Sequence, residues 1–266
     1  MIACAYTFVH GFCALQLLVG VFFLLRQLQR GPSPYGRYTR TPVRTVPARW
    51  AWFLQEMPSL LVPALMACTT DGSAHGRTLL LCTFTLHYLH RTLFYSLLIR
   101  GGKPVPVFIV VSASLFCLLN GFLQSHALLH CSARGLDQDQ DQGRGRDQGR
   151  GWVYSLRTGA GLGLFAFGMI MNIHSDHILR NLRKPGETSY KIPRGGLFEL
   201  VSGANFSCEI LEWFGFAVTV WNLAGFSFFF FSLCSIGPRA FGHHRFYLQK
   251  FPDYPRNRKA LIPFLL

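Results

Sequence analysis

Polar and ionisable side chains interrupt two strongly apolar stretches in the first half of the chain. Gln55 and Glu56 lie in the first stretch, and His87, Tyr88 and Arg91 lie in the second. Their carboxyl, phenol, imidazole and guanidinium groups donate and accept hydrogen bonds. Such groups are costly in hydrocarbon, and they mark functional sites there.

A third apolar stretch carries two acids, Glu209 and Glu212, three residues apart. If this stretch is helical, both carboxyl groups lie on one face. Polar groups on three separate stretches predict a polar cavity enclosed between helices. For any one of these residues, a structural network that locks helices together is the alternative interpretation.

A second group of polar residues follows a later apolar stretch. Asp176 can accept hydrogen bonds from ribose hydroxyls, and Arg180, Arg183 and Lys184 can hold phosphates, for which Arg is the preferred side chain. An ordinary basic membrane loop is the alternative. The same two interpretations apply to a C-terminal group, which consists of Arg239, His243, His244, Arg245 and Tyr247.

Residues 161–166 (GLGLFA) match the loose G-x-G-x-x-A pattern of dinucleotide-binding loops. That pattern needs a preceding strand and a downstream acid in a βαβ unit. Here it lies inside an apolar stretch, so we do not interpret it as a nucleotide site. We expect Gly159 and Gly163 to allow close helix packing instead.

The composition is that of a membrane protein. Of the 266 residues, 50% are hydrophobic, 25 are Phe and only 14% are charged, and the mean hydropathy is +0.26. A soluble domain carries about 25% charged residues. The missing charge is what a lipid-facing surface requires.

The apolar stretches predict an all-α polytopic membrane protein. A spanning helix needs about 20 mostly apolar residues. Such stretches occur at about 5–26, 50–67, 78–99, 105–130 and 152–171, and 197–236 is long enough for two helices joined by a tight turn. We therefore predict seven transmembrane helices that enclose a cavity. The first is read as a transmembrane helix because a cationic n-region is missing.

Lys and Arg residues gather in the segments 27–49, 100–103 and 180–194 and in the tail beyond 236. With seven spans all four segments fall on one side, which the positive-inside rule makes cytoplasmic. The N-terminus is then non-cytoplasmic and the C-terminus cytoplasmic. This distribution accounts for the net charge of +14 without a nucleic-acid partner, and no obligate protein partner is evident.

The prediction treats residues 1–266 as a single membrane domain. The polar segment 136–151 has too few apolar residues to build a core and is expected to be a flexible loop, with an RGG-like RNA-binding segment as the alternative. The eight cysteines include no C-x-x-C pair, so no zinc site or redox dithiol is expected. We expect them to be buried free thiols.

Longer motifs resemble the steroid 5α-reductase family, in its steroid-reducing branch of types one and two. The motifs are 52–59 (WFLQEMPS), 87–92 (HYLHRT), 172–176 (NIHSD), 183–190 (RKPGETSY), 195–198 (GGLF), 202–206 (SGANF), 243–247 (HHRFY) and 258–264 (RKALIPF). The resemblance covers nearly the whole chain from about residue 33. It departs from the family pattern at 99–103 (IRGGK), where Arg100 is the residue that we still carry over from that pattern. It also departs in the loop 136–151, which is atypical.

The resemblance implies a seven-helix enzyme that binds NADPH from the cytosolic side and needs no metal. It would reduce the Δ4 double bond of 3-oxo steroids such as testosterone or progesterone. Its membrane would be the endoplasmic reticulum in a eukaryote or the inner membrane in a bacterium. A reductase of another lipid alkene, such as a polyprenol or an enoyl-CoA, is the enzymatic alternative. A non-catalytic receptor or carrier is the alternative of another class.

The resemblance also implies roles for individual residues. The catalytic set is Glu56, Tyr88 and Gln55, and the substrate-binding set is Trp52, Phe116 and Arg91. The cofactor-binding set is Tyr35, Gly36, Arg100, Asn172, Asp176, Arg183, Ser189, Tyr190, Asn205, Glu209, Ser232, Arg239, His243 and Tyr247. Hydride attack at C5 of the enone would place negative charge on the C3 oxygen. Tyr88 and protonated Glu56 would stabilise that charge by donating hydrogen bonds, with Gln55 orienting Glu56.

Overall fold

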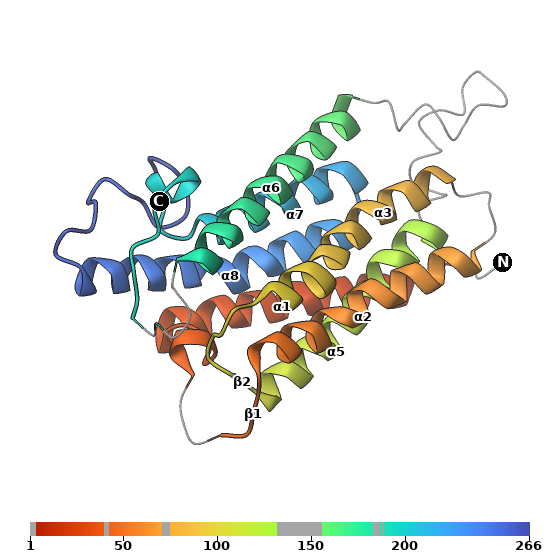
Figure 1. Cartoon of the computed structure of the whole chain (residues 1–266). Helices are drawn as coiled ribbons and strands as arrows, with labels where there is room; N and C mark the ends of the chain where they lie inside the picture. The colour runs from red at the N-terminus through yellow and green to blue at the C-terminus, as the bar shows by residue number, and fades with distance from the viewer. Residues whose placement is uncertain (1–3, 40–42, 71–74, 132–155, 183–186, 188) are drawn as a thin grey trace.

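The computed structural model describes the chain except residues 1–3, 40–42, 71–74, 132–155, 183–186 and 188, so the polar segment 136–151 lies outside the described residues. Long helices make up most of the described chain (Figure 1): α1 (Tyr6–Arg30), α2 (Ala48–Thr69), α3 (His75–Leu89), α5 (Val107–His126), α6 (Leu156–Asn181), α7 (Ala204–Val220) and α8 (Leu223–Lys250). The shorter elements are the 3₁₀ turns Gly36–Tyr38 and Gly196–Glu199, the π-helical turns His90–Tyr95 and Ala127–Cys131, α4 (Ser96–Leu98), and the antiparallel strands β1 (Thr45–Val46) and β2 (Val105–Pro106).

Five helical segments in the described chain are long and apolar enough to cross a membrane. They are Tyr6–Arg30, Ala48–Thr69, Val107–Cys131, Leu156–Asn181 and Leu223–Lys250. The helices α3, with 15 residues, and α7, with 17, are shorter than the roughly 20 residues that a bilayer requires. The chain continues from α3 through the π turn and α4, so this helical stretch is longer than α3 alone.

The predicted break within 197–236 is confirmed. Trp221 adopts a left-handed conformation with φ of 46°, which ends α7. The side chain of Asn222 then accepts a hydrogen bond from the backbone N–H of Gly225, 2.8 Å away, and so caps the start of α8. The helix α8 continues to Lys250, past the expected end at 236. The tail expected beyond 236 is therefore helical at first, and Tyr247 on it is buried and stacked on Tyr254 with ring centroids 5.3 Å apart.

The helices pack as neighbouring pairs, in which α6 lies along α7, α2 along α5 and α1 along α8 (Figure 1). Glycine allows the close approach of α6 and α7. A Cβ atom added to Gly168 would lie 2.7 Å from the Cα of Glu212 and 2.8 Å from the carbonyl oxygen of Cys208. Only a residue without a side chain fits there.

The glycines that we expected at this packing position were the wrong ones. Gly159 and Gly163 have no heavy atom within 4 Å of an added Cβ. Gly161, Gly168 and Gly215 make the contact instead, because Gly161 and Gly168 lie two helical turns apart and so share one face of α6.

A buried network of amides ties α1, α5 and α8 together. Gln16 and Gln124 both donate to the side-chain oxygen of Asn120, each at 3.1 Å. Ser227 donates to Gln16 at 2.8 Å, and Gln124 also donates to the carbonyl of Ala224 at 2.9 Å. Buried amides need such partners, so this network fixes how the three helices fit together.

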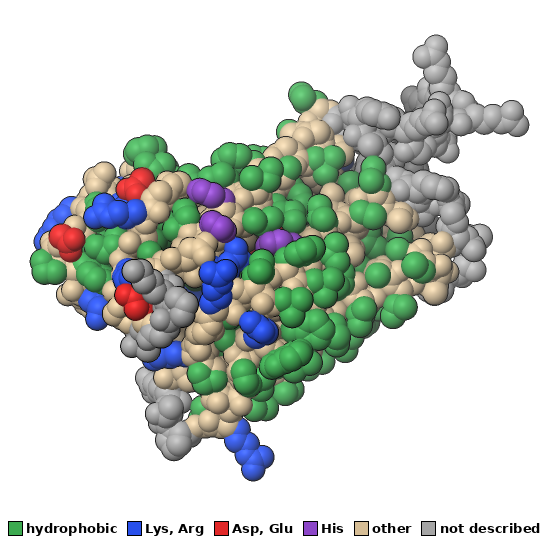
Figure 2. Space-filling model, in the orientation of Figure 1, with side chains coloured by type: hydrophobic (Ala, Val, Ile, Leu, Met, Phe, Trp, Pro, Cys, Tyr) green, Lys and Arg blue, Asp and Glu red, His purple; other side chains and the backbone are tan. Residues whose placement is uncertain are grey.

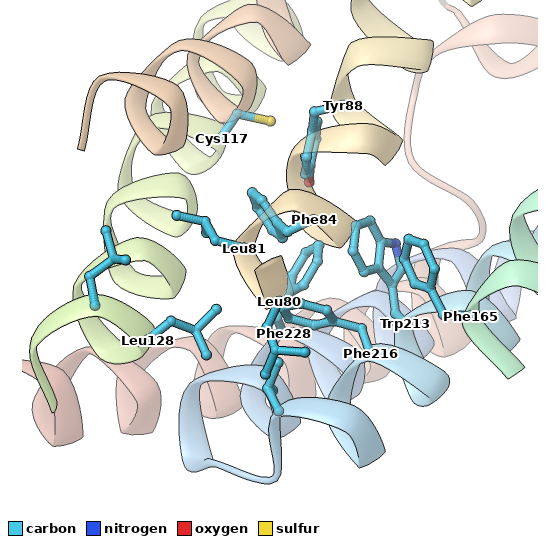
Figure 3. Packing of buried hydrophobic residues seen from close by; sticks show 12 residues of the cluster. Leu80, Leu81, Phe84, Tyr88, Cys117, Leu128, Phe165, Trp213, Phe216 and Phe228 are labelled. Carbon is cyan, nitrogen blue, oxygen red and sulfur yellow. The ribbon is translucent and has the colours of Figure 1, made fainter. Parts of the chain in front are cut away.

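An aromatic core fills the centre of the bundle (Figure 3). Phe84 of α3, Trp213 and Phe216 of α7 and Phe228 of α8 pack against one another, with the Trp213 and Phe228 centroids 4.5 Å apart. Tyr88, one turn beyond Phe84, lies at the edge of this cluster with its hydroxyl pointing along it (Figure 3). The core therefore fixes the position of Tyr88.

The two ends of the bundle differ in charge and in chemistry. Lys and Arg side chains gather at the end that holds the C-terminus, whereas hydrophobic side chains cover the visible middle of the molecule (Figure 2). At the other end, Cys4 and Cys131 form a disulfide. The expectation of eight free thiols is thus wrong for these two, because the start of α1 and the end of the π turn after α5 meet there. The remaining six cysteines are free; four are buried as expected, whereas Cys68 and Cys82 are exposed.

The C-terminal segment folds back on the basic end. Arg258 is almost wholly buried, and it donates to the carbonyl of Pro193 at 2.9 Å and to the carboxylate of Glu199 at 2.8 Å. Glu199 also accepts from the backbone N–H of Gly195, and this hydrogen bond, with Arg258, lowers the pKa of its carboxyl. The segment is therefore held by specific contacts.

The α6–α7 contact gives a direct test. Substituting Gly168→Ala should destabilise the protein by about 1–3 kcal/mol, because the new methyl overpacks the contact with Glu212. The matched control Gly163→Ala adds the same methyl to the same helix where nothing lies within 4 Å. Thermal unfolding in detergent should show a lower Tm for the first variant only. Equal Tm values would contradict the packing described here.

Candidate active site

A cavity of about 420 Å³ lies between the helices near the basic end. Its volume is in the range of about 300–1,000 Å³ that is typical of small-molecule sites. The helices α2, α3, α5, α6, α7 and α8 all contribute side chains to its wall, as do the segment before α2 and the one between α4 and β2. The polar residues in apolar stretches predicted a cavity between helices, and most of them line this one.

All three residues of the expected catalytic set line this cavity. Gln55 and Glu56 come from α2, and Tyr88 comes from α3. The thiol of Cys117 on α5 lies 4.0 Å from Oε2 of Glu56. The backbone carbonyl of Cys117 accepts a hydrogen bond of 2.9 Å from Ser59, which ties α5 to α2 one turn beyond Glu56. A carboxyl and a phenol therefore line the same cavity.

The expected substrate-binding residues Trp52, Phe116 and Arg91 also line the cavity. Phe116 stacks on Phe231 with ring centroids 4.3 Å apart, which forms an aromatic wall. The guanidinium of Arg91 lies 4.8 Å from the centroid of the Trp52 ring and 4.2 Å from that of Tyr95. Arg91 is therefore held between two aromatic faces, which favours a cation at this position.

Arg91 is also the centre of a buried ion-pair network. It donates to the carboxylate of Asp176 on α6 at 3.1 Å, and its other terminal nitrogen lies 3.9 Å from the carboxylate of Glu209 on α7. Arg91 itself lies on the π turn after α3. One cation thus joins three helices at the wall of the cavity.

The expected cofactor-binding residues fall into two groups. Those that line the cavity are Tyr35, Gly36, Asp176, Asn205, Glu209, Ser232 and Arg239. Asp176 and Glu209 line it while paired with Arg91, a contact that the sequence did not indicate.

Arg239 and the loop after α1 form the basic end of the cavity. The Arg239 guanidinium lies 3.7 Å from the centroid of the Tyr35 ring and donates to the carbonyl of Ser33 at 3.4 Å. Gly36 next to it has φ of +63°, a left-handed conformation that favours glycine. Nε of Arg239 is buried and has no hydrogen-bond partner among the described residues. This unpaired donor fits an anionic ligand at the site.

The other expected cofactor residues lie away from the cavity wall. Arg100 is exposed and donates to Asn181 at 3.4 Å, and Asn172 donates to the backbone carbonyl of Asn205 at 2.8 Å. The remaining ones are Ser189, which is exposed, Tyr190 beside Phe246, His243 beside Phe206, and Tyr247 beside Tyr254. Arg183 lies outside the described residues.

The cavity also contains residues to which we assigned no site role. His87 lines the wall, and its Nδ1 lies at hydrogen-bond distance, 2.7 Å, from Oε1 of Glu212, which is fully buried. Gly102 and Lys103, from the segment that departs from the family pattern, line the wall as well, whereas Arg100 of the same segment does not. Only the folded chain shows this difference between residues so close in sequence.

Comparison with known proteins then identifies the family. Residues 103–266 match the family model described as 3-oxo-5-alpha-steroid 4-dehydrogenase. The chain is 50% identical to 3-oxo-5-alpha-steroid 4-dehydrogenase 2 of Homo sapiens over 88% of each chain. It is 48% identical to 3-oxo-5-alpha-steroid 4-dehydrogenase 1 of Mus musculus, over 98% of this chain and 96% of the relative.

The chain belongs to this family. A third relative, 3-oxo-5-alpha-steroid 4-dehydrogenase 1 of Homo sapiens, is 46% identical over 94% of this chain and 93% of its own length. Since type 1 and type 2 relatives match at similar identity, the comparisons support the steroid-reducing branch as a whole.

The Arg91 network yields a stability test. Substituting Arg91→Met should destabilise the protein by about 3–5 kcal/mol, because the buried Asp176 and the partly buried Glu209 would both lose their cation. The matched control Arg100→Met removes an exposed guanidinium and should change stability by less than about 0.5 kcal/mol. Unfolding in detergent measures both, and similar losses would contradict the role of Arg91.

Proposed function

We propose that this member of the family is an NADPH-dependent 3-oxo-5α-steroid 4-dehydrogenase. It would reduce the Δ4 double bond of 3-oxo steroids such as testosterone or progesterone to the 5α product. One observation carries the proposal: Glu56 and Tyr88 line the same cavity as Arg239. The names of relatives at 46–50% identity support the steroid as substrate.

Glu56 and Tyr88 supply the groups that the chemistry requires. When bound, NADPH supplies a hydride to C5 of the enone. Negative charge then develops on the C3 oxygen, and a preorganised donor stabilises the transition state more than the ground state. The Tyr88 phenol and the Glu56 carboxyl, in its protonated form, donate hydrogen bonds to that oxygen, and Gln55 orients Glu56. The aromatic wall of Phe116 and Phe231 gives a rigid apolar ligand a surface to pack on.

Side chains at the basic end would hold the cofactor. Arg239, with its unpaired Nε, and Lys103 provide positive charge, and Asn205 and Ser232 provide polar groups. Phosphates are bound best by such cations. The remaining members of the proposed cofactor set are Tyr35, Gly36, Arg100, Asn172, Asp176, Arg183, Ser189, Tyr190, Glu209, His243 and Tyr247.

The proposal includes seven transmembrane spans, with α3 and its continuation and α7 as the two that length alone does not identify. The basic end then faces the cytosol. The Cys4–Cys131 disulfide at the other end supports this orientation, because disulfides persist in oxidising compartments. The membrane is the endoplasmic reticulum in a eukaryotic host or the inner membrane in a bacterial one. Steroid and bilayer are the proposed partners, with no nucleic acid.

The catalytic assignment is tested with Glu56→Gln and Tyr88→Phe. Each should lower kcat with NADPH and testosterone by about 10²–10³-fold, because each removes one donor to the developing oxyanion. Tyr6→Phe is the matched control, since the Tyr6 hydroxyl donates to the carbonyl of Cys131 at the far end of the bundle. Full activity in both active-site variants would refute the assignment.

The cofactor assignment has a separate test. Arg239→Met should raise the KM for NADPH about tenfold or more and leave the KM for the steroid near its wild-type value, because the lost cation faces phosphate. Arg194→Met, which removes an exposed cation at the same end, is the control. A rise in the steroid KM alone would contradict the proposed cofactor position.

A substrate panel separates the alternatives. NADPH oxidation is measured with testosterone, progesterone, a polyprenol and an enoyl-CoA, with the products identified by mass spectrometry. The proposal predicts turnover of the steroids. Turnover of only the polyprenol or the enoyl-CoA would favour the other reductases, and ligand binding without NADPH oxidation would favour a receptor or carrier.

A further inference from the structure

The proposed reaction needs a proton at C4, whereas the roles proposed for Glu56 and Tyr88 put their donors at the C3 oxygen. Hydride transfer to C5 leaves an enolate, and the saturated ketone forms only when C4 receives a proton. Donors at the C3 oxygen stabilise the enolate, but a proton placed on that oxygen gives an enol. A separate donor must therefore reach C4.

His87, which contacts Glu212, lines the cavity in which the reaction is proposed to occur. Nδ1 of His87 and Oε1 of Glu212 are 2.7 Å apart, and the side chains are 4% and 0% exposed. His87 directly precedes Tyr88 on α3 and lines the cavity, whereas Glu212 does not. Since Nδ1 is engaged by Glu212, Nε2 is the ring nitrogen left to face the cavity.

The surroundings shut Glu212 off from other partners. The ring of Trp213 lies 4.4 Å from that of His87, and the backbone of Glu212 packs closely against Gly168 of α6. Oε2 of Glu212 is buried and has no hydrogen-bond partner among the described residues. In the described structure, His87 is thus the side chain that links this carboxyl to the cavity.

A purely structural role explains this pair poorly. Taking a carboxyl and an imidazole out of water is costly, and apolar side chains of similar volume would often hold two helices as well or better. A neutral pair, with the proton on Oε1 of Glu212 donated to Nδ1 and a second proton on Nε2, avoids a buried net charge. Such a pair stores a transferable proton at the cavity wall.

We propose that Glu212 and His87 form the proton relay that protonates C4. In this step the Nε2–H bond breaks and a C4–H bond forms with the electron pair of the enolate, so that the C3 carbonyl is restored. The Oε1–H bond of Glu212 breaks and an Nδ1–H bond forms, which leaves His87 neutral and Glu212 as a carboxylate. Water that enters after product release returns the proton through His87.

Two substitutions of His87 separate a relay from a structural lock. The side-chain amide of Asn occupies the place of Nδ1, so in His87→Asn its oxygen can still accept from the Oε1–H of Glu212, but the group that faces the cavity is lost. His87→Gln keeps a group in the place of Nε2 and loses the link to Glu212. A relay needs both nitrogens, whereas a lock needs only the first.

The experiment compares His87→Asn, His87→Gln and Glu212→Gln with the wild-type protein in detergent. Thr219→Val is the matched control, because Thr219 is buried on the same helix and its hydroxyl donates to the carbonyl of Gly215 within that helix. The readouts are kcat with NADPH and testosterone, the Kd of each ligand, single-turnover NADPH oxidation, and the effect of D2O on kcat.

The relay predicts that all three variants lose about 10²-fold or more in kcat, as expected for a lost general acid. Ligand Kd values and single-turnover NADPH oxidation should stay within about threefold of wild type, and the D2O effect on kcat should increase. Wild-type kcat in His87→Asn would overturn the relay, even if Glu212→Gln fails to fold. So would a loss of kcat with parallel loss of binding and an unchanged D2O effect.

This inference rests on the proposed function, and the wild-type control keeps the two apart. A wild-type protein that does not oxidise NADPH with any Δ4-3-oxo steroid contradicts the proposed function itself. An active wild type with active His87 and Glu212 variants contradicts only the relay.

Discussion

The pairing of Arg91 with Asp176 and Glu209 is the interaction on which the site depends. A guanidinium enclosed in an apolar bundle is stable only when anions and aromatic faces surround it. Here Asp176 on α6, Glu209 on α7 and the rings of Trp52 and Tyr95 do so. The network forms only when α2, α3, α6 and α7 are in register, and the same register opens the cavity and places Tyr88 and Glu56 on its wall.

The cavity has two different ends, and this polarity matches the two ligands of the proposed reaction. Aromatic side chains from α5 and α8 suit a rigid apolar substrate, whereas Arg239 and Lys103 suit phosphates. Glu56, Tyr88 and His87, to which we assign the hydrogen-bond donors and the proton relay of the proposed reaction, line the same cavity.

Residue type and position along the chain predicted much of this arrangement. Glu56, Tyr88 and Arg91 were identified as candidate site residues because polar groups in apolar stretches carry a desolvation cost. That cost can be read from the sequence without knowing which partners the residues contact. Partners were not predictable, because the Arg91–Asp176 and His87–Glu212 pairs join helices far apart in sequence. The glycine contact was misassigned for the same reason, since only the crossing of α6 and α7 selects Gly168 over Gly163. Likewise, the Cys4–Cys131 disulfide depends on two helix ends meeting.

The most direct test of the account is to follow the hydride. The purified protein is supplied with NADPH that carries deuterium at the transferable position of the nicotinamide, together with testosterone, and the product is analysed by mass spectrometry and NMR. The account predicts a 5α-reduced ketone with deuterium at C5 and a solvent-derived hydrogen at C4. An unreduced steroid, or deuterium at any other carbon, would contradict it.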